Sequence, residues 1–298
     1  MFARALARFR GPNPLNLLEQ QGRRTIATAT TVNADEIAHF SKLSEHWWDE
    51  QGEFKMLHRM NPVRVQFIRD RVVRTRQDEG MPDATDLRGL NALDIGCGGG
   101  LLSESLARLG ANTLAIDASE ANIRIATAHS SQDPLFNASS SVAHKTLAYR
   151  HATSHDLVEE GKQFDLVCSL EVIEHVDNPA GFLESCAALV KPGGHLVLST
   201  IARTPLAYFM TIFMAERVLG IVTPGTHSYS KYVNASELLE FFRTRIPWLP
   251  KGPADPPSHL AELRGMIYYP LSGNWGLLPR GAPLALDCNY IFWLRKPV

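Results

Sequence analysis

A tight group of ionisable residues stands out in the middle of the chain. Glu171, Glu174 and His175 follow a short apolar run at residues 164–169. At spacings of i, i+3 and i+4 they share one face of a helix, so that two carboxylates and an imidazole converge on one point. Oxygen ligands suit magnesium, whereas the imidazole favours zinc, cobalt or manganese. A solvated acidic turn capped by His175 is the alternative interpretation, because three residues form an incomplete ligand shell.

A glycine-rich run, Gly-Cys-Gly-Gly-Gly, covers residues 96–100. It follows an apolar run typical of a strand, residues 92–95, and precedes a predicted helix at residues 101–109. Glycines at such a junction let the backbone approach a nucleotide-like ligand closely. A dinucleotide fingerprint needs a further glycine, but Leu101 and Ser103 stand there in the two possible registers. A dinucleotide-dependent dehydrogenase is therefore disfavoured, and a plain tight turn remains the structural alternative.

An acidic residue, Asp117, ends the next predicted strand, residues 113–116. It lies about 20 residues beyond Gly96, where a carboxylate accepts hydrogen bonds from ribose hydroxyls and disfavours a 2′-phosphate. The pattern favours an adenosine without pyrophosphate, and S-adenosylmethionine is such a ligand. Asp94 or a backbone carbonyl near Gly96 is expected to receive the amino group of its methionine part.

The elements that position these residues alternate in type. Between residues 90 and 200, short apolar runs alternate with longer amphipathic stretches. This alternation predicts an α/β, Rossmann-like fold whose mostly parallel sheet carries helices on both faces. Apolar runs at residues 265–269 and 290–294 are expected to complete the sheet. We expect this domain to cover residues 89–298, with a substrate- or membrane-facing insertion at about residues 203–232.

Two helices are predicted before the sheet. They cover residues 33–54 and 63–76, and the second begins next to Pro62, which suits a helix start. Residues 80–88 have the composition of a linker. We therefore expect residues 32–88 to form an N-terminal helical cap.

The composition excludes several classes of protein. The 298 residues, 45% of them hydrophobic, suffice for a buried core in one or two domains. The net charge of −1 provides no basic field for nucleic acid. The four cysteines form no C-x-x-C pair, so neither a disulfide framework nor a cysteine-based zinc site is indicated.

Residues 1–31 differ from the rest of the chain. Arginine is frequent, Glu19 is the one acidic residue, and Phe2, Leu6 and Phe9 recur at helical spacings. An amphipathic, arginine-rich and acid-poor segment is typical of a mitochondrial transit peptide. We predict such a peptide here, and a frayed basic terminus is the alternative.

The most apolar predicted helix covers residues 206–219. It carries aromatic and methionine side chains nearly all round, up to Glu216 and Arg217. It is too short to span a bilayer, which takes about 20 apolar residues. Such a helix either packs in the core or lies at a membrane interface, where it would collect a lipid-tailed substrate.

These features together resemble known enzymes. The glycine run, Asp117 and the turn at residues 191–194 resemble the class I S-adenosylmethionine-dependent methyltransferases. A narrower resemblance, to the ubiquinone-biosynthesis O-methyltransferases, covers residues 36–290, apart from extra residues at 130–145 and 247–258. Its motifs are Trp47-Trp48-Asp49, Gly52-Glu-Phe-Lys55, Leu57-His58, Asn61-Pro62-Val-Arg64, Glu171-x-x-Glu174-His175 and Pro224-Gly-Thr-His227.

The resemblance implies a seven-stranded sheet whose last strand is antiparallel. It implies methylation of ring hydroxyls on polyprenyl-dihydroxybenzoate and demethylubiquinol, with S-adenosylmethionine and a divalent metal, magnesium in first place. The matching positions are Arg64, Gly96, Asp117 and Leu170 for the cofactor and Glu171, Glu174 and His175 for the metal. The implied partners are a polyprenylated phenolic substrate, a multi-subunit coenzyme Q biosynthetic complex and, by peripheral contact, the matrix side of the mitochondrial inner membrane.

Such a reaction needs little covalent work from the protein. Transfer of a methyl group from a sulfonium to a phenolate requires mainly that donor and acceptor be aligned. A phenol ionises with a pKa of about 10, so a base, or a metal that chelates adjacent oxygens, is expected to favour the phenolate. His175 and His227 are the candidates for the base. Two other functions stay open: methylation of another small catechol or phenol, and a non-catalytic scaffold.

Overall fold

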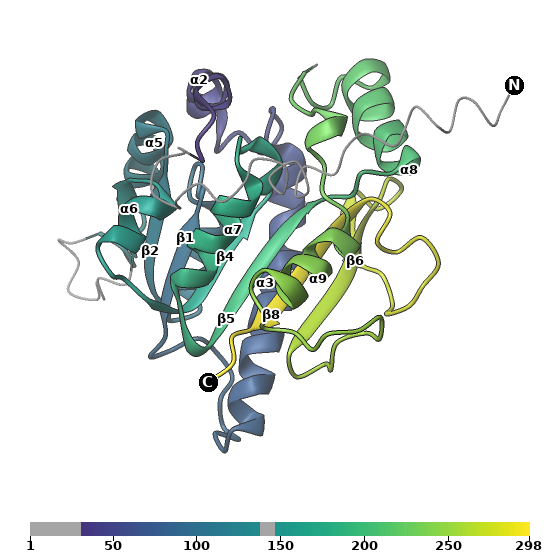
Figure 1. Ribbon diagram of the computed structural model, residues 1–298. Coiled ribbons are helices and arrows are strands. Elements are labelled where there is room, and N and C mark those ends of the chain that lie inside the picture. The colour runs from purple at the N-terminus through teal and green to yellow at the C-terminus, as the bar shows by residue number, and fades with distance from the viewer. Residues whose placement is uncertain (1–30, 138–146, 224) are drawn as a thin grey trace, which may run out of the picture.

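An eight-stranded sheet forms the centre of the molecule (Figure 1). The structure, a computed structural model, describes residues 31–137, 147–223 and 225–298. In spatial order the strands are β3 (Leu147–His151), β2 (Asn112–Asp117), β1 (Asn91–Ile95), β4 (Phe164–Leu170), β5 (Val190–Ile201), β8 (Asn289–Arg295), β6 (Ala261–Tyr269) and β7 (Asn274–Leu277). The predicted transit peptide lies outside the described residues, except for Thr31.

Five neighbouring strands, β3, β2, β1, β4 and β5, run parallel. The apolar residues of the inner strands are buried, most completely along β4, because helices cover both faces of the sheet. Ile95, Asp117 and Leu170 end β1, β2 and β4 and therefore lie at one edge of the sheet. The predicted α/β fold with a mostly parallel sheet is confirmed, and this carboxyl edge is where such sheets bind ligands.

The remaining strands form an antiparallel extension. β8 lies between β5 and β6 and is antiparallel to both, as the resemblance implies for the last strand. β7 pairs with β6 at the outer edge and brings the sheet to eight strands instead of seven. Two strands were not predicted from the sequence: β7, which has four residues including Gly276, and β3, which is largely exposed and carries Arg150 and His151. Neither strand shows a clear apolar run.

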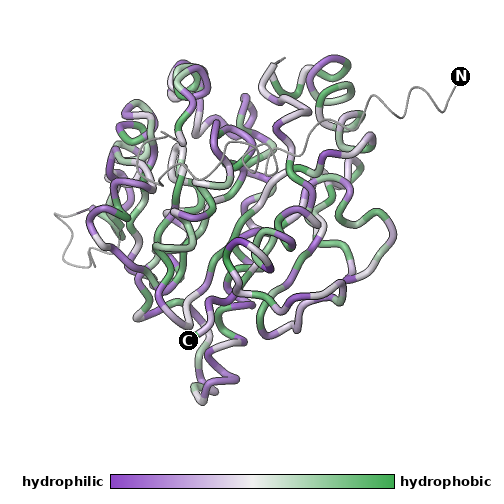
Figure 2. Tube along the Cα trace, in the orientation of Figure 1, coloured by the Kyte–Doolittle hydropathy of each residue, from purple (hydrophilic) through white to green (hydrophobic). Residues whose placement is uncertain are grey.

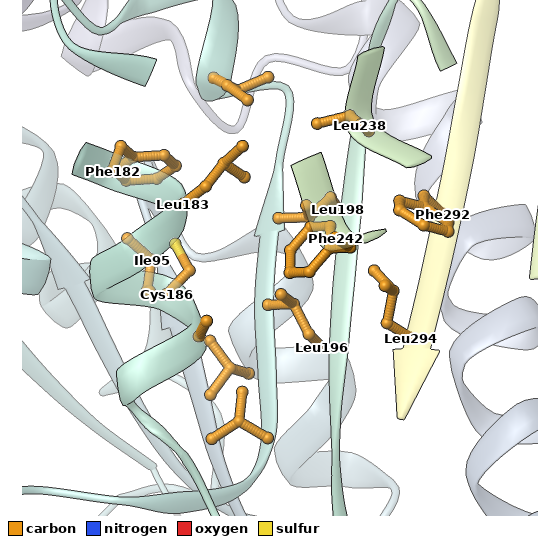
Figure 3. Close-up of a cluster of buried hydrophobic side chains, with 14 of the residues drawn as sticks. Ile95, Phe182, Leu183, Cys186, Leu196, Leu198, Leu238, Phe242, Phe292 and Leu294 are labelled. Carbon is orange, nitrogen blue, oxygen red and sulfur yellow. The ribbon is translucent and has the colours of Figure 1, made fainter. Parts of the chain in front are cut away.

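Helices cover both faces of the sheet. α7 (Pro179–Ala188) and α9 (Ala235–Thr244) lie in front of it in Figure 1, and α3 (Lys55–Asp78) lies behind. Figure 3 shows the front core, where Leu183 of α7 and Phe242 of α9 surround Leu198 of β5. The other helices between the strands are α4 (Leu101–Arg108), α5 (Glu120–Ser130) and α6 (Ser154–Glu159). A second core, with Phe67 and Ile68 of α3, lies on the opposite face.

The N-terminal cap is less regular than the sequence suggested. The predicted helix 33–54 ends early: α2 (Ala34–Leu43) gives way to a 3₁₀ turn, Ser44–His46, and then to non-helical turns. The chain leaves the helical path where Trp47 stacks on Phe54 at 3.7 Å.

The start of the second cap helix also differs from its prediction. α3 begins at Lys55, so Pro62 lies inside the helix instead of at its first turn. Pro62 removes one N–H from the helix ladder. The helix continues because a buried stripe, Met60, Phe67, Ile68 and Val72, holds it against the sheet.

The predicted apolar helix is a π-helix, η4 (Tyr208–Val218), which follows a short turn, α8 (Pro205–Ala207). Figure 2 shows that hydrophobic and hydrophilic positions both occur along it. Ile212 and Glu216 are buried, whereas Phe209, Met210 and Phe213 are more than 40% exposed. Within the described ranges, no helix combines the length and the hydropathy that a membrane span requires.

Candidate functional site

A cavity lies at the carboxyl edge of the sheet. Ile95 and Gly96 at the end of β1, Asp117 at the end of β2 and Glu171 after β4 line it. The cap helix α2 covers the outer side of the cavity, which its residues Glu36, Ile37 and Phe40 line. Further lining comes from residues 152–154, directly after β3. These last residues were not predicted as part of the site because β3 itself was not predicted from the sequence.

Asp117 is held in place by the loop that follows β2. Its Oδ2 accepts a hydrogen bond from the backbone N–H of Gly98 at 2.8 Å, and its Oδ1 accepts one from the backbone N–H of Ser119 at 2.8 Å. Burial raises the pKa of Asp117, and these hydrogen bonds oppose that rise. Oδ1 also accepts the side-chain amide N–H of Asn122 at 3.3 Å, whereas Oδ2 keeps a second lone pair, with which Asp117 can still accept a ribose hydroxyl group.

The glycine run has a packing role that its sequence does not reveal. A Cβ atom on Gly98 would lie 2.3 Å from the ring of Trp47, and one on Gly99 would lie 2.5 Å from the same side chain. Gly98 also has a φ of +54°, which other residues rarely adopt. The indole N–H of Trp47 donates to Asn122 Oδ1 at 2.9 Å, and that of Trp48 donates to the Gly99 carbonyl at 3.0 Å. The cap is thus packed directly onto the glycine loop.

A buried arginine lies beside the cavity. Arg64 of α3 is only 4% exposed, and its Nε has no hydrogen-bond partner among the described residues. Burial lowers the pKa of Arg64, while the nearby carboxylates of Glu171 and Asp94 raise it. Asp94 accepts the Ser103 hydroxyl at 2.5 Å, and burial raises the pKa of Asp94 to about 6. Arg64 therefore retains donor capacity for a further anionic group.

The acidic cluster does not form the helical face that its spacing suggests. Glu171 has a φ of +57°, a costly conformation for a residue other than glycine, and only a short 3₁₀ helix, Ile173–His175, follows it. Glu171 accepts the Ser199 hydroxyl at 2.5 Å, and Glu174 accepts the Thr200 hydroxyl at 2.9 Å. Burial, followed by the negative charge of Glu171, holds the pKa of Glu174 well above its usual value.

His175 is directed toward the cap. Its Nδ1 lies 3.0 Å from an oxygen of Glu36, whose other oxygen accepts a hydrogen bond from Lys231 at 3.0 Å. In the described part of the chain, no group of three or more His, Cys, Asp and Glu side chains is placed to hold a metal ion. The expectation that two carboxylates and the imidazole converge on one point is therefore wrong for this structure, because His175 pairs with Glu36 instead.

Comparison with known proteins identifies the family to which the chain belongs. Residues 56–245 match the family described as a methyltransferase domain. A ubiquinone biosynthesis O-methyltransferase from Roseobacter denitrificans is 39% identical over 91% of this chain and 99% of its own length. A mitochondrial one from Schizosaccharomyces pombe is 40% identical over 94% of this chain and 93% of its own length. The chain belongs to the ubiquinone biosynthesis O-methyltransferases.

The solved structures agree on the fold of this O-methyltransferase. The crystal structure of magnesium protoporphyrin IX methyltransferase from Synechocystis PCC 6803 with bound S-adenosylhomocysteine superposes with a TM-score of 0.52. The match covers 87% of this chain and 94% of that chain at 19% identity, so it shows a shared fold. As a member of its family, the chain is an S-adenosylmethionine-dependent O-methyltransferase.

The structure places the four predicted cofactor residues of the O-methyltransferase differently. Gly96 and Asp117 line the cavity, whereas Arg64 and Leu170 do not. Leu170 ends β4, where it is buried and paired with Ser199 of β5. The cavity and the donor capacity of Arg64 suit an adenosine with an anionic tail, so the residues fit the cofactor. The assignment of each residue stays a prediction.

The second candidate base, His227, belongs to the loop after η4. Its Nδ1 lies 2.7 Å from an oxygen of Glu216, and that carboxylate also accepts the backbone N–H groups of His227 and Gly225. Burial would raise the pKa of Glu216, but these hydrogen bonds and His227 lower it. Glu216 thus orients His227 and holds the loop of Gly225 and His227 against the buried side of η4.

Proposed function

We propose that this O-methyltransferase acts on ring hydroxyls of polyprenyl-dihydroxybenzoate and demethylubiquinol in ubiquinone synthesis. The observation that carries the proposal is the cavity at the ends of β1, β2 and β4 in a chain of this family. In this proposal Asp117 binds the ribose of the cofactor, and Arg64 pairs with its carboxylate. S-adenosylmethionine supplies a methyl group on a sulfonium. The protein aligns donor and acceptor, which is positional catalysis.

Transfer of a labelled methyl group by the purified full chain tests this function. We expect transfer to polyprenyl-dihydroxybenzoate and to demethylubiquinol, and much slower transfer to small catechols without a tail. Equal rates on tail-less phenols would favour a methyltransferase with another small-molecule acceptor. Absence of transfer to every acceptor, with normal cofactor binding, would favour a non-catalytic scaffold.

A general base is the second part of the proposal. His227, oriented by Glu216, and His175, paired with Glu36, both remain candidates. A base with a pKa near neutrality makes kcat fall toward low pH, and its removal abolishes that limb of the pH profile. We therefore expect His227→Asn or His175→Asn, but not both, to lower kcat and flatten the acidic limb of the pH profile.

A divalent cation is a separate proposal, supported by donor chemistry and not by the observed geometry. Glu171 and Glu174 are close enough for the charge of one to raise the pKa of the other. Carboxylate oxygens are the ligands that magnesium prefers. Calorimetric titration of the protein with Mg²⁺ and Mn²⁺ tests this without an activity assay. Heats that persist unchanged in Glu171→Gln and Glu174→Gln would remove the site.

Peripheral membrane contact is proposed for the exposed side of η4. Phe209, Met210 and Phe213 form an apolar surface there, next to exposed Val218 and Leu219. An apolar face of this kind partitions into the headgroup boundary of a bilayer. The double variant Phe209→Glu/Phe213→Glu is expected to lose co-sedimentation with liposomes, whereas Leu271→Glu, a fully exposed control elsewhere, is not. Equal co-sedimentation of all three proteins would contradict this contact.

A mitochondrial location, on the matrix side of the inner membrane, completes the proposal. It is supported by the composition of residues 1–31 and by relatives from Arabidopsis thaliana and Schizosaccharomyces pombe that are named mitochondrial. We further propose a multi-subunit coenzyme Q biosynthetic complex as partner. Import of the full chain into isolated mitochondria, followed by carbonate extraction and native electrophoresis, tests location, peripheral attachment and assembly.

A further inference from the structure

A second hollow lies far from the cofactor cavity in sequence and in the sheet. It is bounded by α3 on one side and by β6 and β7 at the outer edge of the sheet on the other. Its charged lining residues are Asp70, Arg71 and Arg74 of α3 and Glu262 and Arg264 of β6. We refer to this hollow, of about 460 Å³, as the arginine groove.

Guanidinium groups outnumber carboxylates at the floor of the arginine groove. Glu262, whose side chain is 5% exposed, takes ion pairs from Arg71 at 2.7 Å, from Arg280 at 2.5 Å and from Arg264 at 3.4 Å. One carboxylate therefore faces three positive charges. Burial lowers the pKa of Arg71; Glu262 opposes this, and the neighbouring Arg280 and Arg74 lower it further. An added anion would relieve this repulsion.

The other charges at the groove do not supply that anion. Asp70 pairs with Arg69, outside the groove, at 2.7 Å, and both side chains are well exposed. Arg74 pairs with Asp78 at 3.1 Å in a more exposed position. Exposed pairs of this kind are weak and exchange readily.

Two buried donors at the groove have no acceptor. The Nε of Arg71 and the indole Nε1 of Trp275, on β7, are both buried and without a hydrogen-bond partner in the described ranges. Buried polar groups in folded proteins are almost always satisfied, so two unpartnered donors on residues that line one hollow favour an acceptor that enters it. If the ion pairs served only to hold α3 against β6, these two donors would not need to be without an acceptor.

We propose that the arginine groove binds a compact anion that carries a phosphate group. Residues that carry N–H donors line the groove from three elements: Arg71 and Arg74 from α3, Arg264 from β6 and Trp275 from β7. A planar carboxylate presents its oxygens in one plane, and Glu262 already supplies such a group to three guanidinium groups. A tetrahedral phosphate offers oxygens in several directions and so matches donors that converge from different sides.

Calorimetric titration of the full chain with pyrophosphate and with inorganic phosphate, in chloride buffer, tests the proposal. The wild type is expected to bind pyrophosphate, more weakly as salt is raised. Trp275→Phe keeps an aromatic side chain and removes one donor, so it is expected to raise the Kd roughly tenfold. Arg74→Gln is expected to raise the Kd by a smaller factor. Arg124→Gln, an exposed arginine on α5 that pairs with Glu120 and does not line the groove, is the control and is expected to bind as the wild type does.

A second measurement distinguishes a phosphate on a lipid from a phosphate on a soluble molecule. Pelleting with phosphatidylcholine vesicles that contain phosphatidic acid presents the same group on a lipid. If Trp275→Phe lowers pelleting, the ligand is a lipid headgroup; if it affects only the calorimetric titration, the ligand is soluble. Three results overturn the proposal: no binding by folded wild-type protein in either arm, equal affinity in Trp275→Phe and the wild type, or tighter binding of succinate than of phosphate.

Discussion

At the scale of single residues, the site combines local and long-range contacts. Gly96 and Asp117 line the cavity, and both were predicted because each stands at the end of a strand in a recognisable pattern. Glu36 and Trp47 also line it, but they lie far from the strand ends in sequence. No local pattern predicts that a cap residue pairs with His175, since such contacts arise only when the chain folds.

Arg64 is the residue whose role is most directly testable. Its guanidinium is buried and has an unpartnered Nε, so removing it should cost a charge-assisted pair with the cofactor carboxylate. We expect Arg64→Ala to raise the Kd for S-adenosylhomocysteine by at least about tenfold, measured by calorimetry. Arg69→Ala, exposed on the same helix, serves as control. Normal binding by a folded Arg64→Ala protein would exclude the pairing.

At the scale of elements, the packing of the cap on the glycine loop was not predictable. The many aromatic residues before α3 indicated a packed segment, but they did not indicate which part of the protein it packs against. The π-helix η4 was predicted only as an apolar helix, because the wider hydrogen-bond ladder leaves no simple signature in sequence. Pro62 was placed at a helix start by local preference, and tertiary packing of α3 overrode that preference.

A double-mutant cycle measures the coupling between cap and loop. Gly98→Ala alone is expected to destabilise the protein by roughly 2 to 4 kcal/mol, from a left-handed backbone and a clash with Trp47. In a Trp47→Ala background the same change should cost only about 1 to 2 kcal/mol, the backbone part alone. Urea unfolding of the four proteins gives the coupling. Strict additivity would show that the clash is relieved in another way.

The attachment of α2 gives a second prediction for elements. α2 has no fully buried residue, and Glu36 ties it to His175 and Lys231. Burial alone would raise the pKa of Glu36, but these two partners lower it to about 2. We expect Glu36→Gln to speed hydrogen exchange of the α2 amides severalfold, because the ion pairs are lost. Asp35→Asn removes an exposed acid from the same turn and should leave exchange unchanged.

At the scale of the whole molecule, two cores pack against opposite faces of one sheet. This arrangement was predictable from the alternation of strands and helices. The exact strand count was not, because the edge strands β3 and β7 carry little apolar signal. The stability of the whole sheet depends on its centre, where β5 and β8 pair along their lengths.

A buried histidine at that centre makes stability depend on pH. His195 accepts the indole N–H of Trp293 on Nδ1 at 3.1 Å, and burial, helped by Arg71, lowers its pKa to about 4. An unfolded histidine has a pKa of about 6.5, so between pH 6.5 and 4 the unfolded chain binds a proton that the folded chain does not. His195 should therefore cost on the order of 3 kcal/mol of stability as pH falls through that window.

His195→Gln isolates this contribution. The glutamine amide oxygen can accept the Trp293 N–H but does not titrate. Between pH 7 and pH 5, the free energy of unfolding in urea should fall more steeply for the wild type than for the variant. Parallel curves would mean that His195 is protonated equally in the folded and unfolded chains.

The position of β8 has a consequence for biogenesis. β8 comes last of the described strands in the chain, yet it joins the parallel half of the sheet to β6 and β7. During translation the first five strands leave the ribosome well before the strand that covers the open side of β5. A nascent chain therefore exposes that edge of β5 until β8 has emerged, and an unpaired strand edge of this kind is prone to aggregation throughout that interval.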